Sequence, residues 1–140
     1  EEVNRLCVEA QRNPDKLVVI GASKNHQITS IKSAYIAGIE NFGENFLQEA
    51  EVKISSINPS PCWHFIGSIQ SKKAKKIASL FHWVHTVDRM KVAELLNKHR
   101  PLELGKLNIC VQVNPDNEAS KSGIGIEESK ARGHDSGFNA

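Results

Sequence analysis

The sequence predicts an α/β protein built from parallel strands, on three observations. Five short apolar runs rich in β-branched residues end near positions 23, 42, 66, 87 and 113, so successive ends lie 19 to 26 residues apart. The segments between them place apolar residues at helical spacing. This alternation is typical of repeated strand–helix–strand crossovers. A complete (β/α)8 barrel takes about 250 residues, so the 140 residues of this chain predict a partial (β/α)8 TIM barrel with about five strands.

The first strand is expected over residues 17–23, a continuous run of Leu, Val, Val, Ile, Gly, Ala and Ser. Such a run is too short for a helix and is typical of a parallel strand that is buried on both faces. An open doubly wound sheet is the alternative, but the sequence contains neither GxGxxG nor GxxxxGK[ST], which disfavours the common nucleotide-binding versions. The other strands are expected over residues 40–42, 62–66, 83–87 and 107–113.

Helices are expected between these strands, and the first is expected over residues 1–12. Asn45 followed by Gln48 resembles a capping box, in which Asn45 caps the third helix. Ser71 and Asp88 are residue types that favour the N-cap position of the next two helices. The second helix should stop at Gly38 and the fifth before Pro101.

Composition limits the class of protein. Hydrophobic residues make up 39% and charged residues 24%, as in ordinary globular domains, and we expect residues 1–140 to form a single domain. A net charge of +2 is too small to indicate a nucleic acid or a membrane surface as partner. The three cysteines lie far apart without a CxxC pair. We therefore expect no metal site and three reduced cysteines, as in a cytoplasmic protein.

Lys24 ends the first strand, and this is where parallel α/β proteins place their functional groups. Apolar packing around an amine favours its neutral form, which is the form that attacks a carbonyl to make a Schiff base. The alternative is a lysine whose ammonium simply reaches water from the strand end. We expect Val18, Ile20 and Ala22 to point with Lys24 into the barrel.

Four further residues are candidates for binding, each with a structural alternative. Asn45 could contact a group held by Lys24, or only cap its helix. His64 alternates with Trp63 and Phe65 along its strand, which favours a hydrogen-bonded core histidine over one that faces a substrate. Ser120 and Lys121 could bind an anion, or belong to a mobile polar loop.

The basic run 72–76 is the densest cluster of lysines. It could meet RNA or a phosphate, but such a run is more often the solvated face of an amphipathic helix. No aromatic residues alternate with these lysines, which disfavours stacking on bases.

Taken together, the motifs resemble those of one family. Ala22-Ser23-Lys24 is followed in order by four further segments at successive strand ends. These are NFGENFLQE (41–49), WHFIGSIQ (63–70), TVDR (86–89) and VQVN through SKSG (111–123). This order, from the N-terminal helix to about Ile126, closely resembles the pyridoxal phosphate homeostasis protein family, which is related to the N-terminal domain of alanine racemase.

The resemblance implies a fold-type III barrel that holds pyridoxal 5′-phosphate (PLP) as a Schiff base on Lys24. It implies a carrier in vitamin B6 homeostasis that binds the aldehyde without turnover and passes it to PLP-accepting apoenzymes. The resemblance also implies a monomer for the full-length protein. On this basis we assign cofactor binding to Lys24, Asn45, His64, Ser120 and Lys121, and assign no catalytic residue.

Three alternatives remain: a PLP-dependent enzyme such as an amino-acid racemase, a binding module that uses the 72–76 run, and an inactive fragment of the carrier. A lone barrel lacks the second domain that completes a racemase site, which disfavours the first of these.

The chain departs from the family pattern in two places. Residues 25–27 read Asn-His-Gln where the family usually has Thr-Lys-Pro, so a second lysine near Lys24 is missing. The late motifs G-M-S-x-D and R-x-G-x-x-x-F-G, which supply the family's phosphate cradle and an arginine near the pyridine ring, are absent, and residues 129–140 form a divergent tail. We therefore expect a C-terminally truncated chain that binds PLP weakly, and that is marginally stable alone or self-associates.

Overall fold

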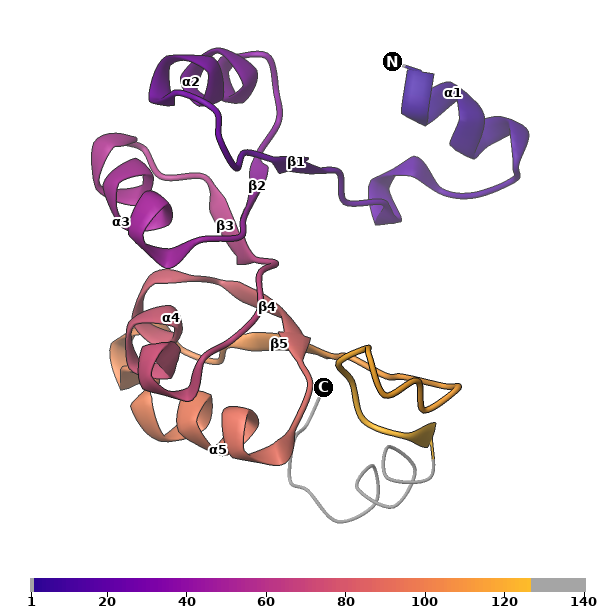
Figure 1. Ribbon diagram of the computed structural model, residues 1–140. Helices are drawn as coiled ribbons and strands as arrows, with labels where there is room; N and C mark the ends of the chain where they lie inside the picture. Colours follow the sequence, from indigo (N-terminus) through magenta and orange to yellow (C-terminus); the bar gives the residue numbers. More distant parts are fainter. Residues whose placement is uncertain (1, 127–140) are drawn as a thin grey trace.

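The computed structural model describes residues 2–126. Its five strands form one parallel sheet in the order β1-β2-β3-β4-β5, so the predicted partial α/β barrel is confirmed (Figure 1). The strands are β1 Ile20–Ala22, β2 Asn41–Glu44, β3 Cys62–Phe65, β4 Trp83–Val87 and β5 Asn108–Val111. The divergent tail expected over residues 129–140 lies outside the described residues.

Helices alternate with the strands as the sequence spacing predicts. They are α1 Glu2–Glu9, α2 Ile28–Ile36, α3 Leu47–Ser56, α4 Ala74–Leu80 and α5 Met90–His99, with short 3-10 turns at Pro14–Lys16, Ser71–Lys73 and Leu102–Leu104. The second helix stops before Gly38, whose φ of 98° is a conformation that glycine adopts at little cost. Among residues 2–126, no helix is long and apolar enough to cross a membrane.

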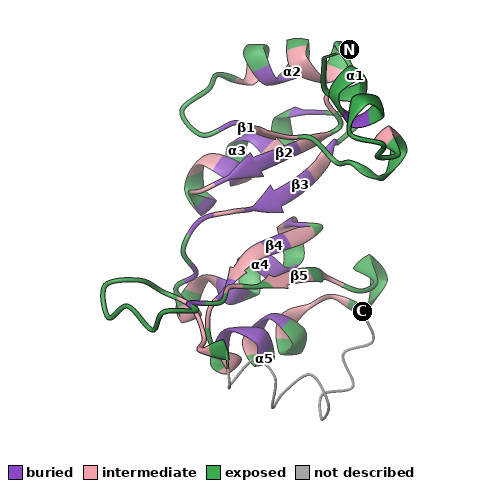
Figure 2. Cartoon of the chain, turned by 90° about the vertical axis from the view of Figure 1, so that its right-hand side faces the viewer, coloured by how far each residue is buried: buried purple, intermediate pink, exposed green. Residues whose placement is uncertain are grey.

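The hydrophobic core lies between one face of the sheet and the helices α2 to α5, which all pack on that side (Figure 1). Phe42, Trp63, Phe65 and Val84 face these helices and are buried. From the helices, Ala74, Ile77, Ala78, Val92 and Leu96 close the core. Most residues of the strands β2 and β3 are buried, whereas residues 24–27 after β1 and residues 115–122 after β5 are exposed (Figure 2).

The first strand is shorter and less buried than the sequence predicts. It starts at Ile20, and Leu17, Val18 and Val19 lie outside it and are exposed, Val18 by 60%. Ile20 pairs with Asn41, the first residue of β2, so the residues before Ile20 have no partner strand in the described part of the chain. Because β1 is an edge strand here, the prediction of burial on both faces was wrong, and Val18 and Ala22 are exposed rather than packed inside a barrel.

The predicted helix caps were also wrong. Phe46, Lys73 and Arg89 occupy the N-cap positions of α3, α4 and α5, and none makes a side-chain capping bond. Asn45 and Asp88 each lie one residue too early, and Ser71 lies in the 3-10 turn that precedes α4. Propensity alone does not fix helix starts, because the register of each loop depends on how the helix packs against the sheet.

Candidate functional site

Lys24 follows β1 at the carboxyl edge of the sheet, as predicted. Its side chain is exposed, and it makes no hydrogen bond or ion pair with another described residue. The strand register holds its position, since Ala22 pairs with Gly43 and the Ser23 N–H donates to the Gly43 carbonyl at 2.9 Å. The Lys24 side chain therefore reaches the surface, as in the alternative of a strand-end lysine, and the expected apolar packing around it is not found in the described part of the chain.

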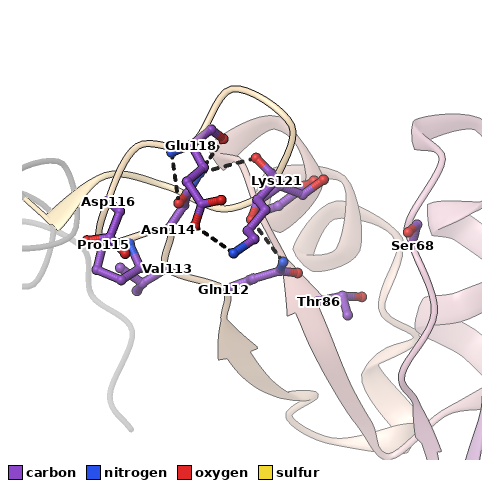
Figure 3. Close-up of a pocket in the computed structure, with 11 residues that line it drawn as sticks. Ser68, Thr86, Gln112, Val113, Asn114, Pro115, Asp116, Glu118 and Lys121 are labelled. Atoms are coloured by element: carbon purple, nitrogen blue, oxygen red, sulfur yellow. Dashed lines mark hydrogen bonds and ion pairs between the residues drawn. The ribbon is translucent and has the colours of Figure 1, made fainter.

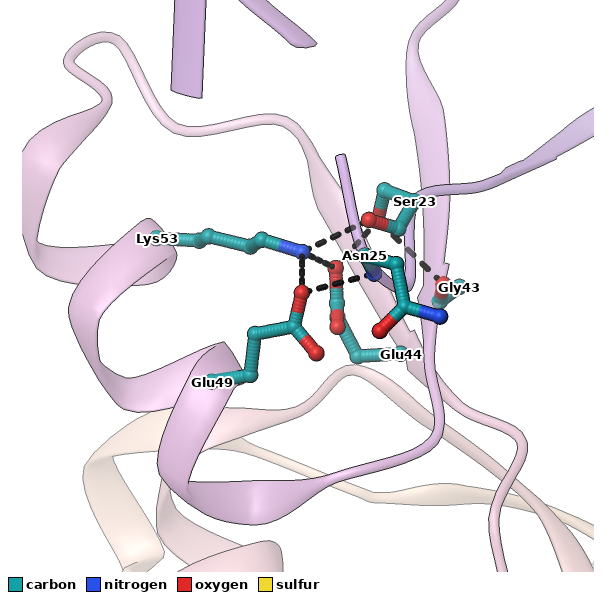
Figure 4. Close-up of polar contacts among 6 residues, drawn as sticks. All are labelled: Ser23, Asn25, Gly43, Glu44, Glu49 and Lys53. Carbon is teal, nitrogen blue, oxygen red and sulfur yellow. Dashed lines mark hydrogen bonds and ion pairs between the residues drawn. The ribbon is translucent and has the colours of Figure 1, made fainter. Parts of the chain in front are cut away.

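A buried ion-pair network, which sequence reasoning missed, surrounds the residues on either side of Lys24 (Figure 4). Lys53 of α3 is 3% exposed, and its Nζ donates to Glu44 Oε1 at 2.7 Å and to Glu49 Oε1 at 2.6 Å. The same Nζ donates to the Ser23 carbonyl at 2.6 Å. We call Ser23, Glu44, Glu49 and Lys53 the Lys53 network.

The network extends to the backbone on the far side of Lys24. The Ser23 hydroxyl donates to Glu44 Oε1 at 2.5 Å, and the Asn25 N–H donates to Glu49 Oε1 at 2.8 Å. The hydrogen bond from Lys53 holds the pKa of the Glu49 carboxyl below its usual range. The one sequence signal was the spacing of Glu49 and Lys53, four residues apart on one helix. Their contacts with Ser23 and Asn25 depend on tertiary structure.

Asn45 follows β2, beside Lys24 in the register of the sheet. Its side-chain Oδ1 is buried and has no hydrogen-bond partner among the described residues. It does not cap α3, so the structural alternative for Asn45 was wrong. A buried acceptor without a partner is uncommon in native structures, so this atom is the unusual feature of Asn45.

His64 lies on the face of the sheet that α2 to α5 do not cover, and it is 2% exposed. Its Nε2 is 2.9 Å from Asn41 Oδ1 and its Nδ1 is 2.9 Å from His85 Nε2. Since the amide oxygen only accepts, His64 donates from Nε2 and accepts from His85 at Nδ1. The indole ring of Trp83 stacks on His64 with the centroids 5.8 Å apart.

These surroundings keep His64 neutral. Burial, followed by repulsion from His85 and His82, lowers the pKa of His64 to about 4. The Cys62 sulfur lies 3.5 Å from His64 Nε2, but burial raises the pKa of this thiol. Among residues 2–126, no cluster of His, Cys, Asp and Glu could hold a metal ion. His64 is thus the hydrogen-bonded core histidine that its strand position favours.

Lys121 borders a cavity of about 360 Å³ at the carboxyl ends of β4 and β5. Ser68 and Thr86 lie on one side of it, and the loop from Gln112 to Ser122 lies on the other (Figure 3). The Lys121 ammonium is exposed and pairs with Glu118 at 2.6 Å. Ser120 is exposed and is not part of the lining.

The structure therefore does not gather the five candidate residues into one pocket. Lys24 and Asn45 lie at the ends of the neighbouring strands β1 and β2, whereas Ser120 and Lys121 lie beyond β5 at the other end of the sheet. His64 lies within β3.

The basic run 72–76 lies on the 3-10 turn and the first residues of α4. Lys72, Lys75 and Lys76 are exposed, and Lys76 pairs with Glu51 of α3 at 2.6 Å. This arrangement matches the solvated helix face that the sequence favours over a nucleic-acid surface.

Comparison with known proteins connects this geometry to one family. A pyridoxal phosphate homeostasis protein of Pseudomonas aeruginosa is 46% identical over 127 residues, which are 90% of this chain and 55% of that protein. A protein of the same name from Buchnera aphidicola is 50% identical over 101 residues, 71% of this chain and 50% of the relative. The chain thus spans about half the length of the curated relatives it matches. No family model matches it.

Solved structures agree with this result. The structure of PipY from Synechococcus elongatus without PLP superposes with a TM-score of 0.76 at 35% identity, covering 94% of this chain and 62% of PipY. PipY with PLP bound gives a TM-score of 0.64 at 39% identity, covering 81% of this chain and 55% of PipY. By sequence and by fold, the chain belongs to the pyridoxal phosphate homeostasis protein family.

Proposed function

We propose that this chain takes part in vitamin B6 homeostasis by binding PLP without turnover, and that Lys24 holds the PLP aldehyde as a Schiff base. The observation that carries the proposal is the position of Lys24. It is an exposed amine without a partner among the described residues, at the carboxyl end of a parallel strand, in a chain similar to a protein solved with PLP bound.

The residues present fit the aldehyde end of PLP. A primary amine is the group that forms a Schiff base, and PLP supplies an electron sink when it is bound. Asn45, with its unpartnered acceptor, lies at the neighbouring strand end and could accept a hydrogen bond from the ligand. Lys121 and Ser120 remain proposed contacts for an anionic group of the ligand. His64 remains a proposed cofactor-binding residue within β3.

The absence of turnover is proposed on the state of the charged groups that bind the residues on either side of Lys24. The Glu44 and Glu49 carboxylates each accept a hydrogen bond from the Lys53 ammonium, and the burial of Glu44 and Lys53 disfavours both as groups that move a proton at a substrate carbon. Racemisation needs a positioned acid–base pair. A holding role fits these residues better than a racemase role.

The partners follow from this role as further proposals. They are PLP itself and the PLP-accepting apoenzymes that would receive it. The cytoplasmic location and the oligomeric state stay predictions.

The test is absorbance of the protein-bound Schiff base after PLP is added to the 140-residue chain and to Lys24→Ala, with Lys75→Ala as a control for an exposed lysine elsewhere. We expect Lys24→Ala to abolish the band and Lys75→Ala to keep it. An equal band in Lys24→Ala would overturn the proposal. Exchange of an amino acid's α-hydrogen with solvent deuterium would favour the racemase alternative instead.

A further inference from the structure

The backbone around Lys24 is held from both sides by side chains that do not touch its amine. The carbonyl of Ser23 accepts from Lys53 Nζ at 2.6 Å, and the N–H of Asn25 donates to Glu49 Oε1 at 2.8 Å. Both anchors come from α3, and Lys53 and Glu49 bind each other at 2.6 Å. One helix therefore fixes both peptide groups that flank Lys24 (Figure 4).

These hydrogen bonds hold a turn at Asn25, which apolar contacts alone would not fix. Asn25 adopts φ of 62°, a left-handed conformation that costs energy for residues other than glycine but that asparagine tolerates best. The Asn25 N–H to Glu49 bond and the His26 N–H to Ser23 carbonyl bond at 3.1 Å both hold this turn. The turn determines the direction in which Lys24 leaves the strand.

Burying the charges of this network also costs free energy of desolvation. Glu44 is 0% and Lys53 is 3% exposed, and buried ion pairs are often no more stabilising than apolar residues of the same volume. All three donors of the Lys53 ammonium are used, on Ser23, Glu44 and Glu49. The three bonds of the buried ammonium limit how far Ser23, Glu44 and Glu49 can move apart, although Glu44 Oε2 is buried without a hydrogen-bond partner among the described residues.

We propose that Lys53 is a positioning residue for Lys24, and that it acts through Glu49 and the Ser23 carbonyl to hold the turn that presents the amine. The inference rests on the proposed function, since it concerns the capture of the PLP aldehyde by Lys24. In that step the neutral amine forms a C=N bond with the aldehyde carbon, and the aldehyde oxygen leaves as water with the two amine protons. Preorganisation of the amine lowers the cost of reaching the reacting geometry.

The experiment compares Lys53→Met, Glu49→Ala and Lys76→Met in the 140-residue chain. Lys76 is the matched control, because it pairs with Glu51 on the surface, away from Lys24. We measure the second-order rate constant for Schiff-base formation with PLP, and amide hydrogen exchange at Asn25. We expect Lys53→Met and Glu49→Ala to slow capture at least tenfold and to speed exchange at Asn25, and Lys76→Met to change neither.

Glu49→Ala keeps the proposal testable should Lys53→Met prove too unstable, because Glu49 is partly exposed and its loss leaves the Lys53–Glu44 pair in place. Acetylation of Lys24 by acetic anhydride, read by mass spectrometry, should stay within twofold of the parent chain in both variants, since that reagent needs no oriented amine. This shows that the Lys24 amine keeps its accessibility, and a cooperative urea unfolding transition in each variant shows that the chain is still folded.

Capture rates within twofold of the parent chain in both variants would overturn the positioning role. The proposed function would still stand, since it depends on Lys24→Ala alone. If Lys24→Ala bound PLP as the parent does, the proposed function would fail, while hydrogen exchange at Asn25 would still show whether the network holds the turn.

Discussion

Gly67, just after β3, packs directly against the main-chain carbonyl of Asn45, just after β2. A Cβ at position 67 would overlap the Asn45 carbonyl oxygen. The two strands stay paired up to this contact, since the Ile66 N–H donates to the Glu44 carbonyl at 2.9 Å. The lack of a side chain at Gly67 therefore lets the proposed ligand-binding loop of β2 lie against β3.

Gly67→Ala should destabilise the chain by about 1–3 kcal/mol, because the backbone of one strand end must move to admit a methyl group. Urea unfolding measures the change. Ser68→Ala, at the next and exposed position, is the control and should stay within about 0.5 kcal/mol of the parent chain. Equal stabilities of the two variants would show that the backbone at Asn45 moves to admit the methyl group at little cost.

Stability should fall with acid because of His64. Its pKa in the folded chain is about 4, below the ordinary value of 6.5. The unfolded chain therefore binds the proton first, and stability is complete above pH 6.5 and is lost as pH falls toward 4. We expect the free energy of unfolding to drop by about 2 kcal/mol from this histidine between pH 7 and pH 4.5.

Urea unfolding across this pH range, with His64→Gln beside the parent chain, measures the contribution. The variant should show a shallower loss in acid, whereas His26→Gln, at an exposed position, should keep the parent slope. A parent and a His64→Gln variant with the same slope would contradict the assignment.

Phe65→Ala should cost about 3–5 kcal/mol, as for other buried phenylalanines. Phe65 is buried and packs edge-on against Phe81 with the ring centroids 5.2 Å apart. Phe46→Ala is the matched control, because Phe46 is mostly exposed and should cost about 0.5 kcal/mol or less. Thermal or urea unfolding of the two variants measures the loss of stability. A larger loss in Phe46→Ala than in Phe65→Ala would contradict the position of the core.

Lys53→Met should destabilise the chain by about 3–5 kcal/mol, because it leaves the Glu44 carboxylate buried without its partner. Replacing both partners in Lys53→Met/Glu44→Leu should recover much of this loss. Chemical denaturation of the two variants measures the difference. A double variant no more stable than Lys53→Met would mean that the two charges do not depend on each other.

The edge at β1 should make the isolated 140-residue chain self-associate or unfold readily. Val18 and Val19 are exposed beside this edge, and open strand edges pair with other chains unless they are charged or covered. Val19→Lys should shift sedimentation toward monomer, and Val52→Lys, at an exposed position on α3, should not. A monomeric parent chain with a sharp, reversible unfolding transition would contradict this prediction.

Much of the fold could be predicted because it is encoded locally. The strand–helix alternation follows from apolar periodicity, and β4 at Trp83–Val87 has the bounds that its residues indicate. The N-caps could not be predicted, since Asn45, Ser71 and Asp88 are good caps by residue type but the loops place other residues at the helix starts. For the candidate site, the sequence placed Lys24 correctly at a strand end, but it indicated none of the partners of its flanking peptides.

The sequence by itself determined the order of the elements, the edge of the sheet where Lys24 lies, and the alternation that turns His64 away from Trp63 and Phe65. These properties depend on residues close together in the chain, through the two-residue period of strands and the spacing of helices. Only the tertiary structure decided that Lys53 reaches Ser23, thirty positions away, and that His64 meets His85. Such pairs depend on the register between strands and on the packing of α3, because polar groups removed from water must find partners wherever the fold brings them together.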